Sequence, residues 1–338
     1  MLTQTKDTHT DPTLNSPRAG HFGILSHLTD IHSIVFHMLV LVAYGISFWI
    51  YQHPGSFGIT SPLSKIAFVL GAAIMLGWVS GVDVGVNFHN HCHRPMFRHR
   101  WLNRWFGRLW TITGAWPSYF WTYAHLTIHH KHLLESDDWT LPRSDKNGNW
   151  ENFYAYCLLH WPWRYVVHFA EEFHPNRCKW TITRRALGEL LIFLVIWTAP
   201  FWLDVQMALL LWVFPQWLAN VAVMGPGMYV QHAGRDKPSA EHRYRHSTTF
   251  VSRFFNLIMF NIGYHAEHHT YPSIHWSELP NLHDQIRDDL IEEQAHVVPF
   301  GYYRAGYLVS RQSEEFDKQH PQYVSTKPNY SSTSEERP

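Results

Sequence analysis

Four long apolar stretches constrain the fold of this 338-residue chain most strongly. A helix needs about 20 apolar residues, within a range of about 17–25, to cross a hydrocarbon core about 30 Å thick. Short segments join the first stretch to the second and the third to the fourth, so each pair predicts an antiparallel hairpin. The sequence therefore predicts an all-α integral membrane protein with two transmembrane hairpins. The predicted spans are residues 34–51, 66–86, 186–203 and 205–230.

The distribution of positive charge predicts which side of the membrane each segment faces. Arginines are concentrated in residues 94–108, and basic residues flank the third and fourth spans on the same side. The hairpin connections carry little positive charge beyond Lys65. Because cytosolic loops are enriched in Lys and Arg, we expect both termini and the segment 94–185 in the cytosol. Two shorter apolar stretches, 105–123 and 254–264, are expected to lie at the cytosolic membrane interface.

Composition agrees with a membrane protein and sets the domain limits. Charged and aromatic residues each make up 16% of the chain, and the net charge of zero gives no electrostatic reason to expect a nucleic-acid partner. Residues 1–30 are polar and lack a signal-peptide pattern, so we expect the first span to be retained. A single membrane domain is predicted over 31–305, followed by a polar tail over 306–338.

Histidines are concentrated in three clusters beside the predicted cytosolic ends of the spans. The first, "NFHNHCHRP", and the third, "HAEHH", have spacings that place imidazoles on one face of a helix. The second is "HLTIHHKH", and a further histidine in "YVQHAG" lies where the fourth span re-enters the cytosol. The candidate metal ligands are His89, His93, His125, His129, His130, His232, His265, His268 and His269.

Nine imidazoles on one side of a membrane indicate metal binding. Neutral imidazole binds iron, copper, nickel and zinc, and one ion takes about four to six ligands, so this number of histidines implies two ions. Zinc hydrolases with an HExxH motif need a Glu between the two histidines, and Glu267 does not occupy that place. Carboxylate di-iron bundles need repeated Glu-x-x-His motifs, which the sequence lacks. An all-imidazole two-iron centre is the interpretation that remains.

The second cluster leaves one alternative open. On a regular helix His132 shares a face with His125 and His129, whereas His130 lies about 100° away from His129. Either this segment is not a regular helix, or His132 replaces His130 as a ligand.

Other residues near the clusters have weaker claims. Asp137, Asp138 and Glu267 are candidate acceptors that would orient ligating imidazoles. His242, His246 and His275 are weaker ligand candidates, together with His132. Isolated histidines are expected to be polar anchors or core residues: His37, His91, His160, His168, His174 and His320.

The three histidine clusters resemble the signature of the membrane fatty acid desaturase family. Its boxes run HxxxH or HxxxxH, then HxxHH or HxxxHH, then HxxHH. Here they begin at His89, His125 and His265, and the flanking sequence "NIGYHAEHHTYPSIHWSELP" is similar to the surroundings of the third box. The order of boxes and spans matches between residues 33 and 300. A His rather than a Gln at position 265 argues against the front-end subgroup.

The resemblance implies a four-span fold whose cytosolic helical cap holds a di-iron centre. It also implies O₂ as co-substrate and an external electron donor of the ferredoxin, rubredoxin or cytochrome b5 type. A further ligand is expected between the fourth span and the third box, which His232 would supply. Because the family acts in membranes on lipid or acyl chains, those substrates are the first expectation here.

Three functions follow from these observations, in order of preference. The first is a desaturase that introduces a double bond into an acyl chain, and the second is a hydroxylase or ketolase of acyl, alkane or carotenoid substrates. The third, a metal carrier or haem-binding subunit, is weaker because such proteins place ligands inside their spans, where only His37 lies here. An apolar tunnel would position the substrate and exclude water. The aromatic residues beside the boxes are expected at the membrane interface more than in this tunnel: Trp116, Tyr119, Trp121, Tyr264, Tyr271 and Trp276.

Overall fold

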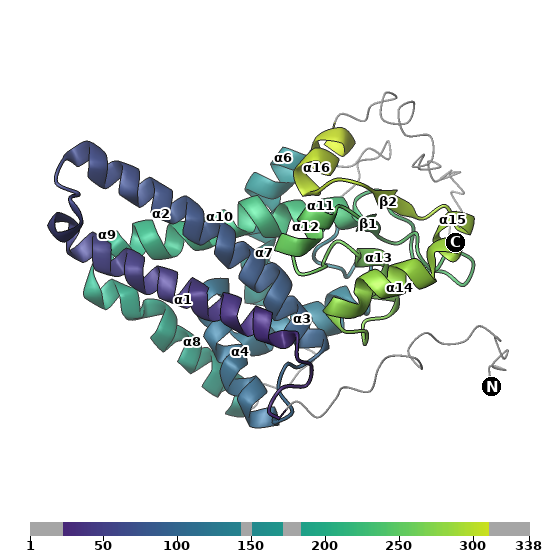
Figure 1. The fold of residues 1–338 in the computed structure, drawn as a ribbon, viewed down its shortest axis with the longest axis horizontal. Coiled ribbons are helices and arrows are strands. Elements are labelled where there is room, and N and C mark those ends of the chain that lie inside the picture. The colour runs from purple at the N-terminus through teal and green to yellow at the C-terminus, as the bar shows by residue number, and fades with distance from the viewer. Residues whose placement is uncertain (1–22, 143–150, 172–183, 311–338) are drawn as a thin grey trace, which may run out of the picture.

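A computed structural model describes residues 23–142, 151–171 and 184–310 of the chain, which are mostly helical. Figure 1 shows long helices on one side and a cap of short elements on the other. The α-helices are α1 Asp30–Gln52, α2 Pro62–Val82, α3 His89–His93, α4 Arg100–Gly114, α5 Ser118–Tyr123, α6 Phe153–Ala155, α7 Trp161–Glu171, α8 Arg184–Leu203, α9 Val205–Ala208, α10 Phe214–Ala219, α11 Gly225–His232, α12 Arg253–Ile258, α13 His265–Thr270, α14 Leu279–Gln285, α15 Arg287–Glu292 and α16 Tyr302–Ser310. Short 3₁₀ helices span Pro54–Phe57 and Trp276–Glu278, and π-helical segments span Asp83–Phe88, Ala124–His129, Tyr156–His160, Leu209–Val213 and Asn220–Met224.

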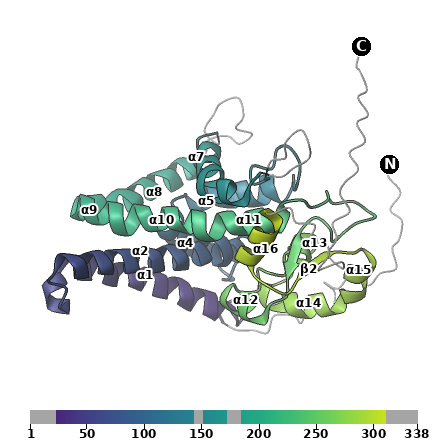
Figure 2. The same cartoon turned by 90° about the horizontal axis from the view of Figure 1, so that it is seen from above.

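Three continuous helices are long and apolar enough to cross a membrane. They run over Asp30–Gln52, Pro62–His93 and Val205–His232, and contain 23, 32 and 28 residues. The fourth predicted span, 186–203, lies in α8, whose described apolar part Leu187–Leu203 is shorter than these three. Figures 1 and 2 show α8 alongside the others, with both hairpin connections at the end of the molecule opposite the cap.

The outer faces of these helices expose large apolar side chains. Leu63 is 76% exposed and Trp202 is 86% exposed. An aqueous surface seldom carries such side chains over whole helices, because their contact with water is unfavourable. Hydrocarbon is the surrounding that suits these faces.

Two glycines allow α2 to pack closely against the helix that follows α9. A Cβ atom added at Gly77 would lie 2.6 Å from Leu218 Cβ, and one added at Gly81 would lie 2.5 Å from Val223 Cβ. The four-residue spacing places both glycines on one helix face, as in the small-xxx-small pattern of membrane helix pairs. Backbone-to-side-chain packing therefore fixes the contact between the two hairpins.

Both prolines of the fourth predicted span lie inside one continuous helix. Pro215 follows the π-helical segment Leu209–Val213, and Pro226 follows Asn220–Met224. Proline lacks an N–H and crowds the carbonyl four residues earlier, and a wider turn before it relieves that contact. The chain thus passes each proline without ending the helix.

A buried polar contact joins the first hairpin to α4. His37 Nδ1 lies 2.7 Å from Asp83 Oδ2, and the other carboxylate oxygen accepts a hydrogen bond from Trp110 Nε1 at 3.1 Å. Thr113 Oγ1 also donates to this carboxylate, at 2.9 Å. His37 is therefore a core residue, as predicted, and the carboxylate buried beside it is well partnered.

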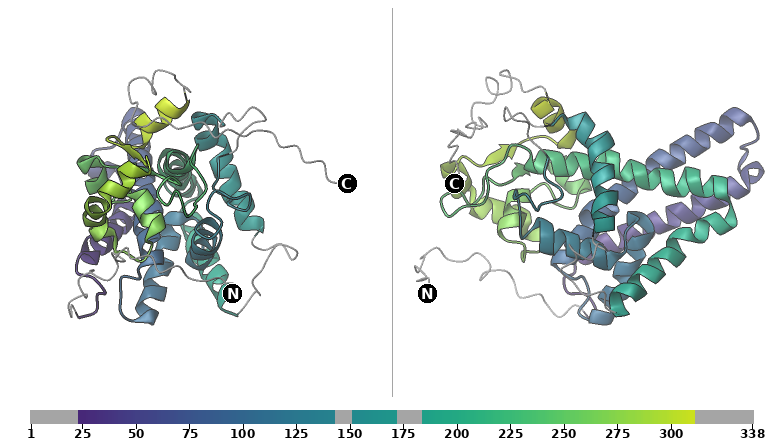
Figure 3. Two further views of the ribbon diagram at one scale, coloured as in Figure 1. Left: turned by 90° about the vertical axis from the view of Figure 1, so that its right-hand side faces the viewer. Right: turned by 180° about the vertical axis from the view of Figure 1, so that it is seen from behind.

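The cap departs from an all-α structure in one place. Strands β1 Thr248–Phe250 and β2 His296–Val298 pair in parallel, with Thr248 opposite His296 and Phe250 opposite Val298. Viewed from the cap side, Figure 3 shows these short elements gathered over the ends of the long helices. The cap brings β1, α13 and the end of α11 together, and α13 carries the third histidine box.

Candidate metal centre

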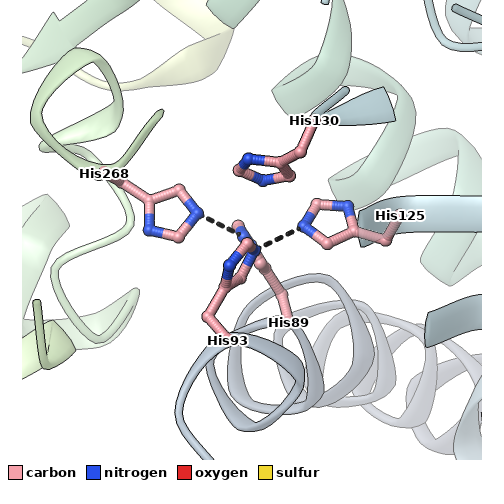
Figure 4. Close-up of side chains that lie close together, drawn as sticks. All are labelled: His89, His93, His125, His130 and His268. Carbon is pink, nitrogen blue, oxygen red and sulfur yellow. Dashed lines mark hydrogen bonds between the residues drawn. The ribbon is translucent and has the colours of Figure 1, made fainter. Parts of the chain in front are cut away.

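Five histidines from three separate segments meet beneath the cap. Their rings point toward one another from α3, from the second box and from α13, as Figure 4 shows. One ring nitrogen of each lies within 4.8 Å of those of the other four. The Nε2 atoms of His89 and His268 are 2.8 Å apart, and those of His93 and His125 are 2.9 Å apart. We call this group the first cluster: His89, His93, His125, His130 and His268.

A π-helical turn explains how the second box contributes two rings to the first cluster. The segment Ala124–His129 is π-helical, and the His130 N–H donates to the His125 carbonyl at 3.0 Å. This five-residue step places His125 and His130 one above the other, which a regular helix would not do. His132 instead lies outside the clusters, and its Nδ1 is 2.9 Å from Glu135. The structure thus selects His130 over His132.

A second cluster lies beside the first. Ring nitrogens of His129, His232 and His269 lie within 4.8 Å of one another. His265 adjoins this group, because its Nε2 is 3.1 Å from Nε2 of both His232 and His269. The rings of His130 and His269 stack across the boundary with centroids 4.1 Å apart. All nine predicted ligands are therefore gathered at two adjacent positions.

The spacing of the ring nitrogens suits metal coordination. Two imidazole nitrogens bound at right angles to one ion about 2.1 Å away lie about 3.0 Å apart. The nitrogen pairs of 2.8, 2.9 and 3.1 Å agree with that geometry. The Nε2 atoms of His129 and His130 are buried and have no hydrogen-bond partner among the described residues. Lone pairs that converge without donors are what a metal ion would satisfy.

A buried carboxylate orients one of these imidazoles. Asp138 is 4% exposed, and His129 Nδ1 donates to its two oxygens at 3.1 Å each. Thr140 also donates to Asp138, from its hydroxyl at 2.7 Å and from its backbone N–H at 3.0 Å. Because Nδ1 carries the proton, Nε2 of His129 presents its lone pair to the second cluster. Asp138 thus has the orienting contact that the sequence suggested.

Burial keeps the cap imidazoles neutral, which is the form that binds metal. Burial first, and neighbouring imidazoles second, lower the pKa values of His125, His130 and His269 well below 6.5. For His268, burial and His129 lower the pKa to about 3. Burial alone would raise the pKa of Asp138, but nearby His129, His232 and Thr140 outweigh it and hold that pKa below 3.8.

Four other predicted residues lie away from the two clusters. Asp137 is exposed, and Glu267 is buried but accepts hydrogen bonds from Thr249 and His283 rather than from a clustered imidazole. His275 Nε2 contacts Asp30 at 2.9 Å. His242 has no ring contact with either cluster.

The remaining single histidines divide between core and surface roles. His246 borders His269, with ring centroids 5.8 Å apart, and its Nε2 contacts Thr270 Oγ1 at 3.2 Å. His91 is buried against Trp110, and His160 contacts Glu151. His168 stacks on Trp139 with centroids 4.7 Å apart. His174 and His320 lie outside the described residues.

An apolar cavity of about 570 Å³ adjoins both clusters. His89 and His125 of the first cluster, His129 of the second cluster and the adjacent His265 form part of its wall. Trp121 lines it too, so among the six aromatic residues near the boxes this one faces the cavity. The other lining residues are Gly85, Val86, Trp139, Thr140, Trp161, Val223, Met224, Gly227, Met228, Gln231, Met259, Ile262 and Tyr302.

Several of these functional residues had no motif to reveal them. Met224 and Met228 look like ordinary residues of an apolar span, and Thr140 follows the second box in an irregular segment. Ser247 Oγ lies 3.4 Å from His232 Nδ1 and 2.9 Å from His246 Nδ1. Only the folded chain brings these side chains to the clusters.

Comparison with known proteins agrees with this site. The chain is 24% identical over 284 residues to Alkane 1-monooxygenase 1 of Alcanivorax borkumensis, and the alignment covers 78% of this chain. It covers 61% of that relative, so the chain spans about three fifths of the relative's length. The model of the family described as fatty acid desaturase matches residues 64–301, which is more than two thirds of the chain and includes all three histidine boxes. This protein belongs to the fatty acid desaturase family.

Proposed function

We propose that the protein is a membrane-bound, O₂-dependent oxidoreductase that holds two iron ions and oxidises an unactivated C–H bond in a hydrocarbon chain. The observation that carries this proposal is the shared wall of the cavity. Imidazoles of both clusters line the same space as apolar side chains such as Trp121, Val223 and Met224. A hydrocarbon bound there would lie directly beside the metal ligands.

The residues present suit two ions. The first cluster would hold one ion and the second cluster, with His265, the other. Bound iron would supply the activation of O₂ and the oxidising power for hydrogen removal. The protein supplies neutral imidazole lone pairs, the Asp138 carboxylate that fixes His129, and an apolar cavity that positions the chain and excludes water.

The preferred product is a double bond in an acyl chain, because the chain belongs to the fatty acid desaturase family. A hydroxylated chain is the second candidate, and the similarity to an alkane monooxygenase favours it specifically. The two outcomes differ in the fate of the second step: loss of a neighbouring hydrogen gives the alkene, and gain of oxygen gives the alcohol.

The proposal includes a membrane topology and an electron donor. α8 would complete a four-span arrangement, with the cap in the cytosol on the arginine-rich side of the spans. Electrons would come from a separate ferredoxin, rubredoxin or cytochrome b5 type protein.

Expression in a host of known lipid composition, followed by mass spectrometry of lipids and added alkanes, tests the function. Loss of two hydrogen atoms from an acyl chain supports desaturation, and gain of one oxygen atom supports hydroxylation. Iron analysis of the purified protein should give about two ions per chain. No product from any hydrocarbon substrate, together with no bound iron, would refute the proposal.

A further inference from the structure

A group of basic side chains is buried in the cap, apart from the two histidine clusters. It lies where three segments meet: the turn after α11, the residues that lead into β1, and β2. The Arg235 N–H donates to the His232 carbonyl at 3.2 Å, and the Asp236 N–H donates to the Arg245 carbonyl at 3.3 Å. β1 and β2 pair side by side, with Thr248 opposite His296 (Figure 1). These contacts hold Arg235, Arg245, Thr248 and His296 in one region.

Arg235 lacks the partners that a buried guanidinium needs. Its Nε and Nη1 atoms are buried and have no hydrogen-bond partner among the described residues. The hydroxyl of Thr248 is also buried and without a partner there. A guanidinium offers five N–H donors, and leaving them unpaired away from water is costly. The protein side chains described in this region therefore leave Arg235 incompletely satisfied.

The local charge is positive. The carboxylate of Asp236 is held by Arg245, with Nη2 and Oδ2 2.6 Å apart. His296 is 6% exposed, and burial, followed by Arg235 and Arg245, lowers its pKa to about 2, so it is neutral. Two guanidinium groups thus face one carboxylate, which leaves one positive charge in excess. An anion with several acceptor oxygens would balance this charge and accept the free hydrogen bonds.

We propose that Arg235, Arg245, Thr248 and His296 form a buried binding site for an oxyanion of the phosphoryl class, either free phosphate or the head group of an acidic phospholipid. Arg235 and Thr248 supply donors that have no other described partner, and Arg245 adds charge. The occupant would also brace the site of His232, since Arg235 bonds to its backbone and Ser247 contacts its ring at 3.4 Å. This inference is independent of the metal and of the proposed reaction.

Thermal unfolding of the full chain in neutral detergent tests the site, with inorganic phosphate added and sodium chloride adjusted to constant ionic strength. The unfolding midpoint of the unmodified protein should rise saturably with phosphate. Arg235→Gln should abolish the rise. Arg287→Gln, which removes an exposed arginine on α15, should leave it unchanged. Thr248→Val keeps every charge and should require a several-fold higher phosphate concentration for the same rise.

The outcomes decide the proposal and the source of the anion. No rise in the unmodified protein, or the same rise in Thr248→Val and Arg235→Gln, would overturn it. If Arg235→Gln does not fold, the Thr248→Val titration decides alone. Short-chain phosphatidic acid acting at lower concentration than phosphate identifies a lipid head group, and equal potency identifies the free anion. An equal effect of short-chain phosphatidylcholine, which carries no net charge, would contradict a specific anion site.

Discussion

His129 Nδ1 lies 3.1 Å from both carboxylate oxygens of Asp138, inside a cap that leaves Asp138 only 4% exposed. Partners of this kind set the tautomer and basicity of metal-ligating imidazoles, and their removal typically costs about 10–100-fold in metal affinity or activity. We expect Asp138→Asn to lower iron retention by that amount, measured as iron per chain after dialysis against a chelator. Asp137→Asn, at an exposed neighbouring position, is the matched control and should retain iron normally.

Exchange of histidines distinguishes members of the clusters from their neighbours. His268→Ala removes a ring whose Nε2 is 2.8 Å from that of His89, so product formation and iron content should both fall sharply. His132→Ala removes a partly exposed ring that contacts Glu135, and activity should stay within about twofold of normal, as for most surface changes. Equal losses in both variants, measured by product mass spectrometry and iron analysis, would contradict the assignment of His130 over His132.

Metal removal should make stability depend on pH. Burial and His129 lower the pKa of His268 in the folded protein to about 3, whereas an unfolded histidine has a pKa of about 6.5. The unfolded state therefore binds more protons between these values, and folding stability falls as the pH drops below about 6.5. Each extra proton contributes about 1.4 kcal/mol per pH unit. The unfolding midpoint of chelator-treated protein should fall between pH 7 and pH 5, and bound iron should reduce that dependence. A flat profile in the metal-free protein would contradict neutral buried imidazoles.

Filling the cavity should block the substrate without disturbing the metal. Met224 lines the cavity, so Met224→Trp should lower turnover at least tenfold while iron content stays unchanged. Leu209→Trp places the same side chain at an exposed position of the same continuous helix, and turnover should not change. Product formation with hydrocarbons of different length provides the measurement. Loss of iron in Met224→Trp would show that the variant damages the centre instead.

The contact between the two hairpins depends on missing side chains. A Cβ at Gly81 would lie 2.5 Å from Val223 Cβ, so Gly81→Leu should lower the free energy of unfolding by about 1–3 kcal/mol. Gly71 on the same helix has nothing within 4 Å of an added Cβ, and Gly71→Leu should be tolerated. Thermal unfolding of both variants in detergent checks this prediction, and equal midpoints would contradict the close packing.

The sequence predicts the helical character, the three longest apolar helices and the convergence of nine histidines. Spacing suffices for His265, His268 and His269, because a regular helix places residues three and four apart on one face. It fails for the second box, where the π-helical turn at Ala124–His129 changes the periodicity. It also misses β1 and β2, which contain only three residues each and pair across a long separation in the chain.

The cavity could not be predicted for a related reason. Its wall combines single residues from α2's continuation, α11, α16 and the irregular segments beside the boxes. Among them, Val223 and Met224 lie in a π-helical segment, so the face they present does not follow from a helical period. Apolar residues in a predicted span give no sign of whether they face lipid or an interior space.

The wider turn at Ala124–His129 has a consequence for how such boxes can vary. The third box separates its first ring from its paired rings by two residues and uses a regular helix, whereas the second box has three intervening residues. One additional residue is absorbed locally by a change of hydrogen-bonding step, and the rest of the helix keeps its direction. Insertion or deletion of a single residue at this point could therefore survive, provided that the turn adjusts and the rings still meet.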